Sequence, residues 1–574
     1  MLDHLIKGAT VVDGSGAGRF VGDVALRDGR IVAVGRVTES ARHTIDADGL
    51  VVCPGFVDPH THYDAQLFWD PFATPSNLHG VTSVIGGNCS FALAPLHDVD
   101  ADYTRRLMAK VEGMPLEALE QGVPWTWESF GEYLDALEGR VALNAGFIAG
   151  HSALRRYVLG PKANLTAADG SSLPALRAAL SDALRQGALG FSTDISGVHS
   201  DGDGAPVPAK GADAAEILSL CEIVGQHPGT TLAGIFDGGS DGFSEKELEL
   251  LSGMSATANR VLNWNLLVVD ANAAGRLDRQ MALSRRARTV GGRVVALMMP
   301  TIVPMNMSFG NYCALWLMPG WGPIMRLPVG ERIHALGNAE NRRMMVARAN
   351  SDEAGMFRRL ADFGGYVIGD TFSEANRGLS GRVVRDIARE RHADPFDTLV
   401  DIVVEDNLRT VLWPSAPDDD APHWALRQSL WDDPDVLLGG SDAGAHLDRM
   451  CGGSYPTQFL ADMLRGRRSM SLEHAVQLLT EKPAQMFGLR DRGHIAVGAF
   501  GDLVIFDPAT IDAAPARLVR DLPGGSARLT ADATGIAHVF VNGVETVTDG
   551  AATGALPGTV LRSGRDTVTV TARP

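Results

Sequence analysis

The chain has 574 residues, of which 45% are hydrophobic, and a formal net charge of −18 at pH 7. This length and composition provide a large core, which argues against a disordered or fibrous protein and predicts one large domain with an accessory domain, or two to three domains. The acidic balance argues against nucleic acid or an anionic membrane surface as a partner, because both are bound through basic faces. A small neutral or weakly charged ligand is expected.

The cysteines and the apolar runs indicate the compartment. Five cysteines are scattered through the chain without a CxxC pair, which is typical of a reducing cytosol. The sequence MLDHLIKGATVVDG lacks the apolar core of a signal peptide, and no apolar run reaches the length of a membrane span. We therefore expect a soluble, cytoplasmic protein without disulfides. The oligomeric state is left open, with a homo-oligomer as one option.

The two ends of the chain share one pattern. Residues 5–37 contain short alternating apolar segments separated by Asp-Gly turns, as in small antiparallel strands joined by hairpins. The same pattern returns at residues 492–507 and 535–550. We therefore expect residues 1–52 and 491–574 to fold together into one β-sandwich.

The middle of the chain, residues 53–490, alternates between strands and helices. Apolar, β-rich runs end in polar or glycine residues, and amphipathic stretches such as TWESFGEYLDALE and LPALRAALSDALRQ lie between them. This alternation predicts an α/β fold, a (β/α)8 TIM barrel, whose active site is built at the carboxyl ends of the strands. The runs are VVCPGFVDPHTH, GVTSVIGGNCS, ALNAGFIAGHS, GALGFSTDIS, TTLAGIFDGG, RVLNWNLLVVD, RVVALMMPT and DVLLGGSDAGAH.

A long stretch separates the last two of these runs. We interpret MNMSFGNYCALWLMPGWGPIMRLP as part of an insertion or lid, around residues 301–365. The segment GGYVIGD, residues 364–370, is either an extra strand or the true next-to-last strand of the barrel, so the strand count is provisional.

Two histidines, His60 and His62, follow the first barrel strand. Residues i and i+2 of a strand point to the same side, so both imidazoles project into the barrel mouth, a geometry suited to one metal ion. For an isolated HxH motif the alternative is a pair of solvated loop histidines. Asp442, which ends the last strand in GGSDAGAH, stands on the other side of the same mouth and favours the metal site.

This combination resembles the amidohydrolase superfamily, in which the first-strand HxH and the last-strand Asp flank the metal and the Asp handles the proton of the attacking water. The segment GGNCSFALAPLH, residues 86–97, is similar to the N-acyl-D-amino-acid deacylase (D-aminoacylase) family, in which that cysteine is a zinc ligand. TWESFGEYLDALE, AGHSALRRYVLG and LLTEKPAQMFGL also match, so the resemblance covers nearly the whole chain. It implies Cys89 as a zinc ligand. A buried, inert thiol is the alternative.

The sequence departs from that family at the fifth and sixth strands. There the family supplies two metal-binding histidines, whereas TTLAGIFDGG and RVLNWNLLVVD contain none. Asp237, Asn263 and Asn265 stand nearby, and asparagine is a poor zinc ligand. In addition, no lysine ends a barrel strand, where a carboxylated lysine could bridge two metals.

We therefore expect one divalent metal ion per chain, with zinc implied by the resemblance. Its ligands would be His60, His62 and Asp442, with Cys89 either completing a tetrahedron or leaving its place to water.

Three further side chains are candidate substrate-binding groups. His151 and Arg155 follow the third strand, where an arginine can pair with a substrate carboxylate. The alternative is an arginine that fixes the loop by pairing with an acidic neighbour. His199, in the loop after the fourth strand, either binds substrate or replaces a missing histidine ligand. Its alternative is an exposed imidazole in a Gly/Asp-rich turn.

The residues and the resemblance together predict a metal-dependent hydrolase of a linear amide C–N bond, in an N-acyl-D-amino acid or a related N-acyl amine. Asp442 would accept a proton from the attacking water and deliver it to the leaving nitrogen. Two alternatives stay open. One is an enzyme of the same fold that acts on a cyclic amide, urea or carbamate. The other is a catalytically idle relative kept for binding. The acyl group, the side chain and the D/L preference are left open by the sequence.

Overall fold

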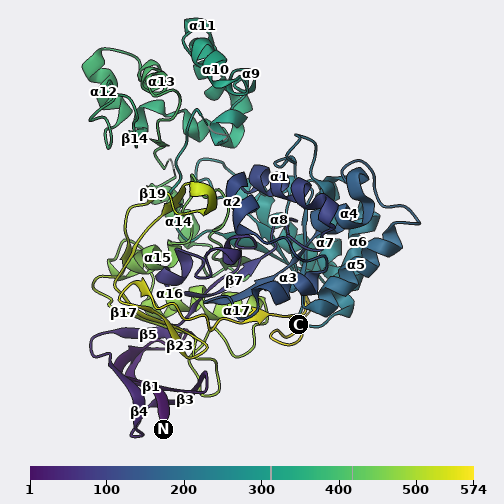
Figure 1. Cartoon of the computed structure of the whole chain (residues 1–574), viewed down its shortest axis with the longest axis vertical. Coiled ribbons are helices and arrows are strands. Elements are labelled where there is room, and N and C mark those ends of the chain that lie inside the picture. Colours follow the sequence, from purple (N-terminus) through teal and green to yellow (C-terminus); the bar gives the residue numbers. More distant parts are fainter. Residues whose placement is uncertain (311–312, 417, 574) are drawn as a thin grey trace. The chain divides into compact units, whose positions relative to one another are not determined.

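The computed structural model describes residues 1–310, 313–416 and 418–573. The chain forms two compact units (Figure 1). Unit 1 comprises Met1–Val303 and Leu426–Pro574, and unit 2 comprises Pro304–Ala425. Among the described residues, no helix has both the length and the apolar character that crossing a membrane requires.

A nine-stranded sheet in unit 1 combines strands from both ends of the chain, as predicted (Figure 1). The two ends meet where Val504 pairs with Cys53 in an antiparallel register. One apolar core, which includes Ile6, Val24 and Phe540, draws on both sets of strands. The strands are β1 (Leu2–Val11), β2 (Phe20–Arg27), β3 (Arg30–Gly35), β4 (Ala41–Asp46), β5 (Val51–Pro54), β17 (Leu503–Phe506), β22 (Ile536–Val541), β23 (Val544–Thr548) and β24 (Ala551–Ala552).

Short two-stranded ribbons accompany this sheet. One pairs β18 (Asp512–Ala513) with β21 (Ala533–Thr534), and the other pairs β19 (Arg517–Val519) with β20 (Arg528–Thr530).

The parallel strands of the barrel follow the predicted runs in order. Neighbouring strands pair in parallel, and Thr61 and Ala443 form a parallel bridge between the chain segments that follow the first and last strands. The third strand is interrupted at Ile148 and is assigned as β8 and β9. The strands are β6 (Phe56–Asp58), β7 (Val81–Gly86), β8 (Asn144–Phe147) with β9 (Ala149–Gly150), β10 (Gly190–Asp194), β11 (Thr231–Ile235), β12 (Val261–Asn265), β13 (Arg293–Met298) and β16 (Val436–Leu438).

The helices of unit 1 alternate with these strands. The two amphipathic stretches singled out in the sequence are helices, and the first begins with a capping box between Ser129 and Glu132. The helices are α1 (Ala101–Val111), α2 (Leu116–Gly122), α3 (Phe130–Leu137), α4 (His151–Leu159), α5 (Leu173–Gln186), α6 (Ala214–Gln226), α7 (Glu245–Ala258), α8 (Arg276–Thr289), α15 (Tyr455–Leu464), α16 (Leu472–Leu479) and α17 (Glu481–Met486); α14 (Ala421–Gln428) spans the junction of the two units.

The C-terminal segment leaves the sandwich after β24. Strand β25 (Val560–Leu561) pairs in parallel with β8, and both of its residues are fully buried. Residues 491–574 were expected to belong to the sandwich, but β25 lies against the barrel. Burial of its two apolar side chains there explains the difference. The boundaries 1–52, 53–490 and 491–574 stay a prediction.

Unit 2 has its own apolar core, in which Trp321, Phe363 and Phe396 contact one another. It extends beyond the expected insertion around 301–365 because helices farther along the chain share this core. The segment 364–370 supplies β14 (Val367–Ile368), which pairs with β15 (Leu412–Trp413) and is an extra strand. Residues 311 and 312 of the expected lid stretch lie outside the described residues. The helices are α9 (Gly322–Met325), α10 (Val329–Leu336), α11 (Ala339–Ala349), α12 (Val384–Arg391) and α13 (Pro395–Glu405).

A buried ion pair joins the sandwich to the barrel. Arg492 and Asp502 are each 3% exposed and are in contact. Asp502 also accepts hydrogen bonds from the Asn144 side chain of β8, at 3.1 Å, and from the Asn542 backbone N–H, at 2.7 Å. The Arg492 guanidinium stacks over the Phe500 ring at 3.9 Å. The carboxylate therefore holds three chain segments together.

We expect Arg492→Met to lower the free energy of unfolding by about 3–5 kcal/mol, because it leaves the Asp502 carboxylate buried without its cation. Arg30→Met is a matched control: Arg30 stacks on the same ring at 4.0 Å but pairs with Asp491 at the surface, where both side chains are about half exposed. Its loss should cost less than about 1 kcal/mol. Denaturant unfolding measures both, and equal losses would contradict the prediction.

Candidate active site

The HxH segment is clamped between two neighbours beyond the end of β6. Thr61 donates its backbone N–H to Ile85 of β7 at 2.9 Å, and His62 donates its N–H to Ala443 at 2.7 Å. Asp442 donates its N–H to the His60 carbonyl at 3.1 Å. Both histidines are buried, and their ring centroids are 5.3 Å apart. The alternation of the strand therefore turns both imidazoles to one side, as the spacing predicts.

Cys89 and Asp442 bring a thiol and a carboxylate to the same imidazoles. The Cys89 Sγ lies 3.6 Å from His60 Nε2, and Asp442 Oδ1 lies 3.5 Å from His60 Nε2 and 3.1 Å from His62 Nε2. The backbone of Cys89 has φ 52° and that of Asp442 has φ 57°. Such left-handed conformations cost of order 1–3 kcal/mol in residues with a side chain, and they concentrate at functional sites.

Acidic side chains surround this cluster. Glu112, which caps α1, places Oε1 3.3 Å from His62 Nδ1. Burial, and then the charges of three neighbouring carboxylates, raise the pKa of Glu112 well above its usual range. Burial alone would raise the pKa of Asp442 too, but hydrogen bonds from His60 and His62 hold it well below its usual range. The three neighbours of Glu112 are Asp442, Asp64 and Asp194.

The donor set fits a divalent metal ion. Donor atoms of His60, His62 and Cys89 all lie within 4.8 Å of one another. Among the described residues, no Lys or Arg forms an ion pair with Glu112, Asp64 or Asp442. Imidazole, thiolate and carboxylate groups are the ligands that zinc takes in proteins, and a cation would balance the excess negative charge.

Comparison with known proteins decides the family. The model of the Amidohydrolase family matches residues 43–551 of the chain. The chain belongs to the amidohydrolase family. The superfamily resemblance noted in the sequence is thereby confirmed, and the barrel with its two-ended sandwich is the fold of this amidohydrolase.

Several relatives resemble this amidohydrolase over nearly its whole length. It is 28% identical to the D-aminoacylase of Alcaligenes xylosoxydans xylosoxydans, with 97% of each chain covered. It is 30% identical to the N-acyl-D-aspartate deacylase of the same organism, with 98% of this chain and 95% of the relative covered. A crystal structure of D-aminoacylase matches with a TM-score of 0.62 and 26% identity, over 98% of this chain and all of that one.

The end of β12 carries an amide that contacts the cysteine. Asn265 donates its side-chain N–H to the Cys89 Sγ at 3.2 Å, whereas Asn263 donates to the Val295 carbonyl in the barrel wall. Burial, and then nearby carboxylates, raise the pKa of the Cys89 thiol well above its usual range. Asn265 thus supports the sulfur as a hydrogen-bond donor, a role that the sequence alone did not indicate.

His199 is held by a buried carboxylate. Its Nδ1 lies 2.7 Å from Asp194 Oδ2, and the other oxygen of Asp194 accepts hydrogen bonds from the backbone and side chain of Ser196. The imidazole is 18% exposed, and its ring meets the Phe91 ring edge to face at 5.4 Å. It is therefore an oriented, half-buried side chain and differs from the freely exposed turn imidazole of the alternative interpretation.

His151 and Arg155 lie inside the protein, where both side chains are fully buried against Glu216 of α6. Arg155 also donates to the backbone carbonyls of Ala163 and Thr166, so its guanidinium is enclosed by partners. Burial would raise the pKa of Glu216, but hydrogen bonds from His151 and Arg155 lower it to about 2. This placement favours the alternative in which Arg155 fixes the loop through an acidic neighbour.

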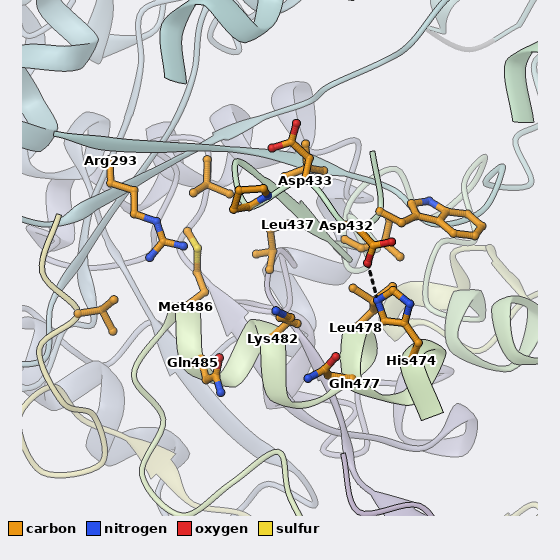
Figure 2. Close-up of a pocket in the computed structure, with 16 residues that line it drawn as sticks. Arg293, Asp432, Asp433, Leu437, His474, Gln477, Leu478, Lys482, Gln485 and Met486 are labelled. Carbon is orange, nitrogen blue, oxygen red and sulfur yellow. Dashed lines mark ion pairs between the residues drawn. The ribbon is translucent and has the colours of Figure 1, made fainter. Parts of the chain in front are cut away.

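A cavity of about 370 Å³ lies away from these residues (Figure 2). Its lining includes Arg293 at the start of β13, all of β16, and side chains of α16 and α17. Figure 2 shows His474 paired with Asp432 there, at 2.9 Å. None of the candidate catalytic or metal-binding residues lines it. The chemistry of a barrel enzyme is expected at the carboxyl-terminal ends of the strands.

We expect Arg155→Met to lower the free energy of unfolding by about 3–5 kcal/mol, because it leaves Glu216 buried without its main cation. The KM of the folded fraction, measured well below the melting temperature, should stay near that of the unmodified enzyme. A large rise in KM with unchanged stability would instead indicate that Arg155 binds substrate.

Proposed function

We propose that this amidohydrolase hydrolyses the linear amide bond of small N-acyl-D-amino acids with the help of one zinc ion. The observation that carries the proposal is the convergence of two imidazoles, a thiol and a carboxylate at the carboxyl ends of the barrel strands. The substrate class is supported by the near full-length similarity to D-aminoacylase and N-acyl-D-aspartate deacylase. Cys53, Cys89, Cys221 and Cys451 are buried thiols outside any disulfide, which supports a reducing compartment, and we propose that the enzyme is cytoplasmic.

The proposed zinc ligands are His60, His62, Cys89 and Asp442. Bound there, zinc would polarise the amide carbonyl and lower the pKa of water. A single ion is supported by the absence of histidine from β11 and β12. A D-aminoacylase of similar structure has a binuclear metal centre with one-metal activation and second-metal attenuation.

Asp442 is the proposed proton carrier. Its Oδ1 contacts both imidazoles, whereas Oδ2 accepts no hydrogen bond from any described residue. The side chain is 24% exposed and can therefore reach water and substrate. It accepts a proton from the water whose oxygen attacks the amide carbon. The C–N bond then breaks as the same proton passes to the leaving nitrogen. The second proton of the water leaves the new carboxyl group for the amine, which yields a carboxylate and a free D-amino acid.

We also propose that His199 contacts the substrate. Asp194 occupies its Nδ1, which leaves Nε2 as the ring nitrogen available to a ligand. With a proton on Nδ1, Nε2 is a hydrogen-bond acceptor and suits an N–H group of the substrate.

Removal of the metal should abolish hydrolysis of N-acetyl-D-amino acids, and readdition of about one equivalent of zinc should restore it. Elemental analysis should find about one ion per chain, and His60→Ala and His62→Ala should each lower that content. His474→Ala, in the cavity of Figure 2, is the control and should keep metal and activity. A requirement for two equivalents would contradict the single-ion proposal. Turnover of N-acetyl-L-amino acids alone would contradict the D-specific substrate.

Asp442→Asn should lower kcat about 10²- to 10⁴-fold, because the amide cannot accept the proton of the attacking water. Elemental analysis should show that most of the metal is retained. Asp448→Asn changes a carboxyl group a few residues away that pairs with Arg449, and it should keep its rate. Wild-type kcat in Asp442→Asn would require another base.

A further inference from the structure

Glu112 reaches the proposed zinc site from outside the barrel strands. It caps the C-terminal end of α1, and its backbone carbonyl accepts a hydrogen bond from the His446 N–H, in the segment that follows Asp442. This contact fixes the Glu112 backbone beside the last strand's end. Its side chain, only 5% exposed, then points to His62.

The contact between these two side chains is isolated. Glu112 Oε1 and His62 Nδ1 are 3.3 Å apart, although their orientation falls short of a hydrogen bond. Both atoms are buried, and neither has another hydrogen-bond partner among the described residues. Among the residues that the structure describes, no other group competes for that bond.

If Glu112 served packing alone, its carboxyl group would destabilise the fold at this position. It is buried, and Asp442 and Asp64 are close enough to add repulsion. An apolar side chain of similar length would avoid both costs. We therefore expect the Glu112 carboxyl oxygen to act on the atom nearest to it, His62 Nδ1.

We infer that Glu112 is a positioning residue, whose Oε1 accepts the Nδ1 proton of His62 and so directs the His62 Nε2 lone pair toward the metal. This inference rests on the proposed zinc function. A carboxyl group that holds the second nitrogen of a ligating imidazole fixes both its tautomer and its ring orientation. Without it, the proton can move to Nε2, and that tautomer cannot bind a metal through Nε2.

The test compares zinc affinities of metal-depleted proteins by competition with a chromophoric chelator. Glu112→Met removes the acceptor, and we expect it to weaken zinc binding about 10- to 100-fold. Glu112→Gln keeps a carbonyl acceptor at the same reach and should recover most of that affinity. The metal-free Glu112→Met protein should melt no lower than the wild type, because a buried carboxyl group has gone.

A matched control separates positioning from electrostatic attraction. Asp64 is another buried carboxyl group near the site. It accepts a hydrogen bond from the Gly87 N–H, and it forms no hydrogen bond or ion pair with an imidazole of the described residues. Asp64→Asn should keep zinc affinity within about threefold if the contact with His62 is what matters. An equal loss in Asp64→Asn and Glu112→Met would show that negative charge acts at a distance, and would overturn the positioning role.

Three other outcomes would overturn the inference. Zinc affinity of Glu112→Met within threefold of the wild type would show that His62 needs no such partner. Equal losses in Glu112→Met and Glu112→Gln would exclude the acceptor role. Altered visible absorption of cobalt(II)-loaded Glu112→Gln would identify Glu112 as a direct ligand. Failure of the proposed function is distinguishable, because the wild type would then bind no zinc or leave N-acyl-D-amino acids intact.

Discussion

The site depends on backbone hydrogen bonds between the segment that follows the first barrel strand, β6, and the segment that follows the last, β16. Asp442 donates to the His60 carbonyl and His62 donates to the Ala443 carbonyl, so residues far apart in the sequence lie in fixed register. The approach is close enough that a Cβ on Gly444 would lie 2.4 Å from the His62 carbonyl oxygen, and its φ of 90° also requires glycine. Below this contact, Asp58 accepts N–H groups from His60 and Ser441 and holds both segments.

This clamp has an electrostatic consequence. It brings Asp442 close to the buried carboxyl groups of Glu112 and Asp64, where water screens the charges poorly. Hydrogen bonds from His60 and His62 offset part of that charge. They lower the pKa of Asp442 more than burial raises it. A dication on the histidines and the thiol would offset more of it, so metal binding and stability of the site are expected to be coupled.

The sequence revealed those parts of the site that local periodicity governs. Buried parallel strands appear as continuous apolar runs, and the i, i+2 rule places His60 and His62 on one side. Glu112 could not be found this way, because it reaches His62 only through the packing of α1 beside the His446 segment. The strand-end rule also suggested that Arg155 faces the mouth. Its partner, Glu216, comes from a different helix, and only the tertiary structure brings the two together.

Strand β12 carries two asparagines and no histidine, and the side chain of each asparagine donates a hydrogen bond. Asn263 faces the wall and satisfies a carbonyl of β13, while Asn265 faces the mouth and donates to the Cys89 sulfur. A donor stabilises the thiolate form that zinc requires, since a hydrogen bond to a charged group favours that charge. The proposed ligand set then contains two neutral imidazoles, one thiolate and one carboxylate, whose summed charge equals that of a single zinc ion in magnitude. An added imidazole at Asn265 would contribute no charge and would remove this donor, so the amide is the better partner for a centre with one ion.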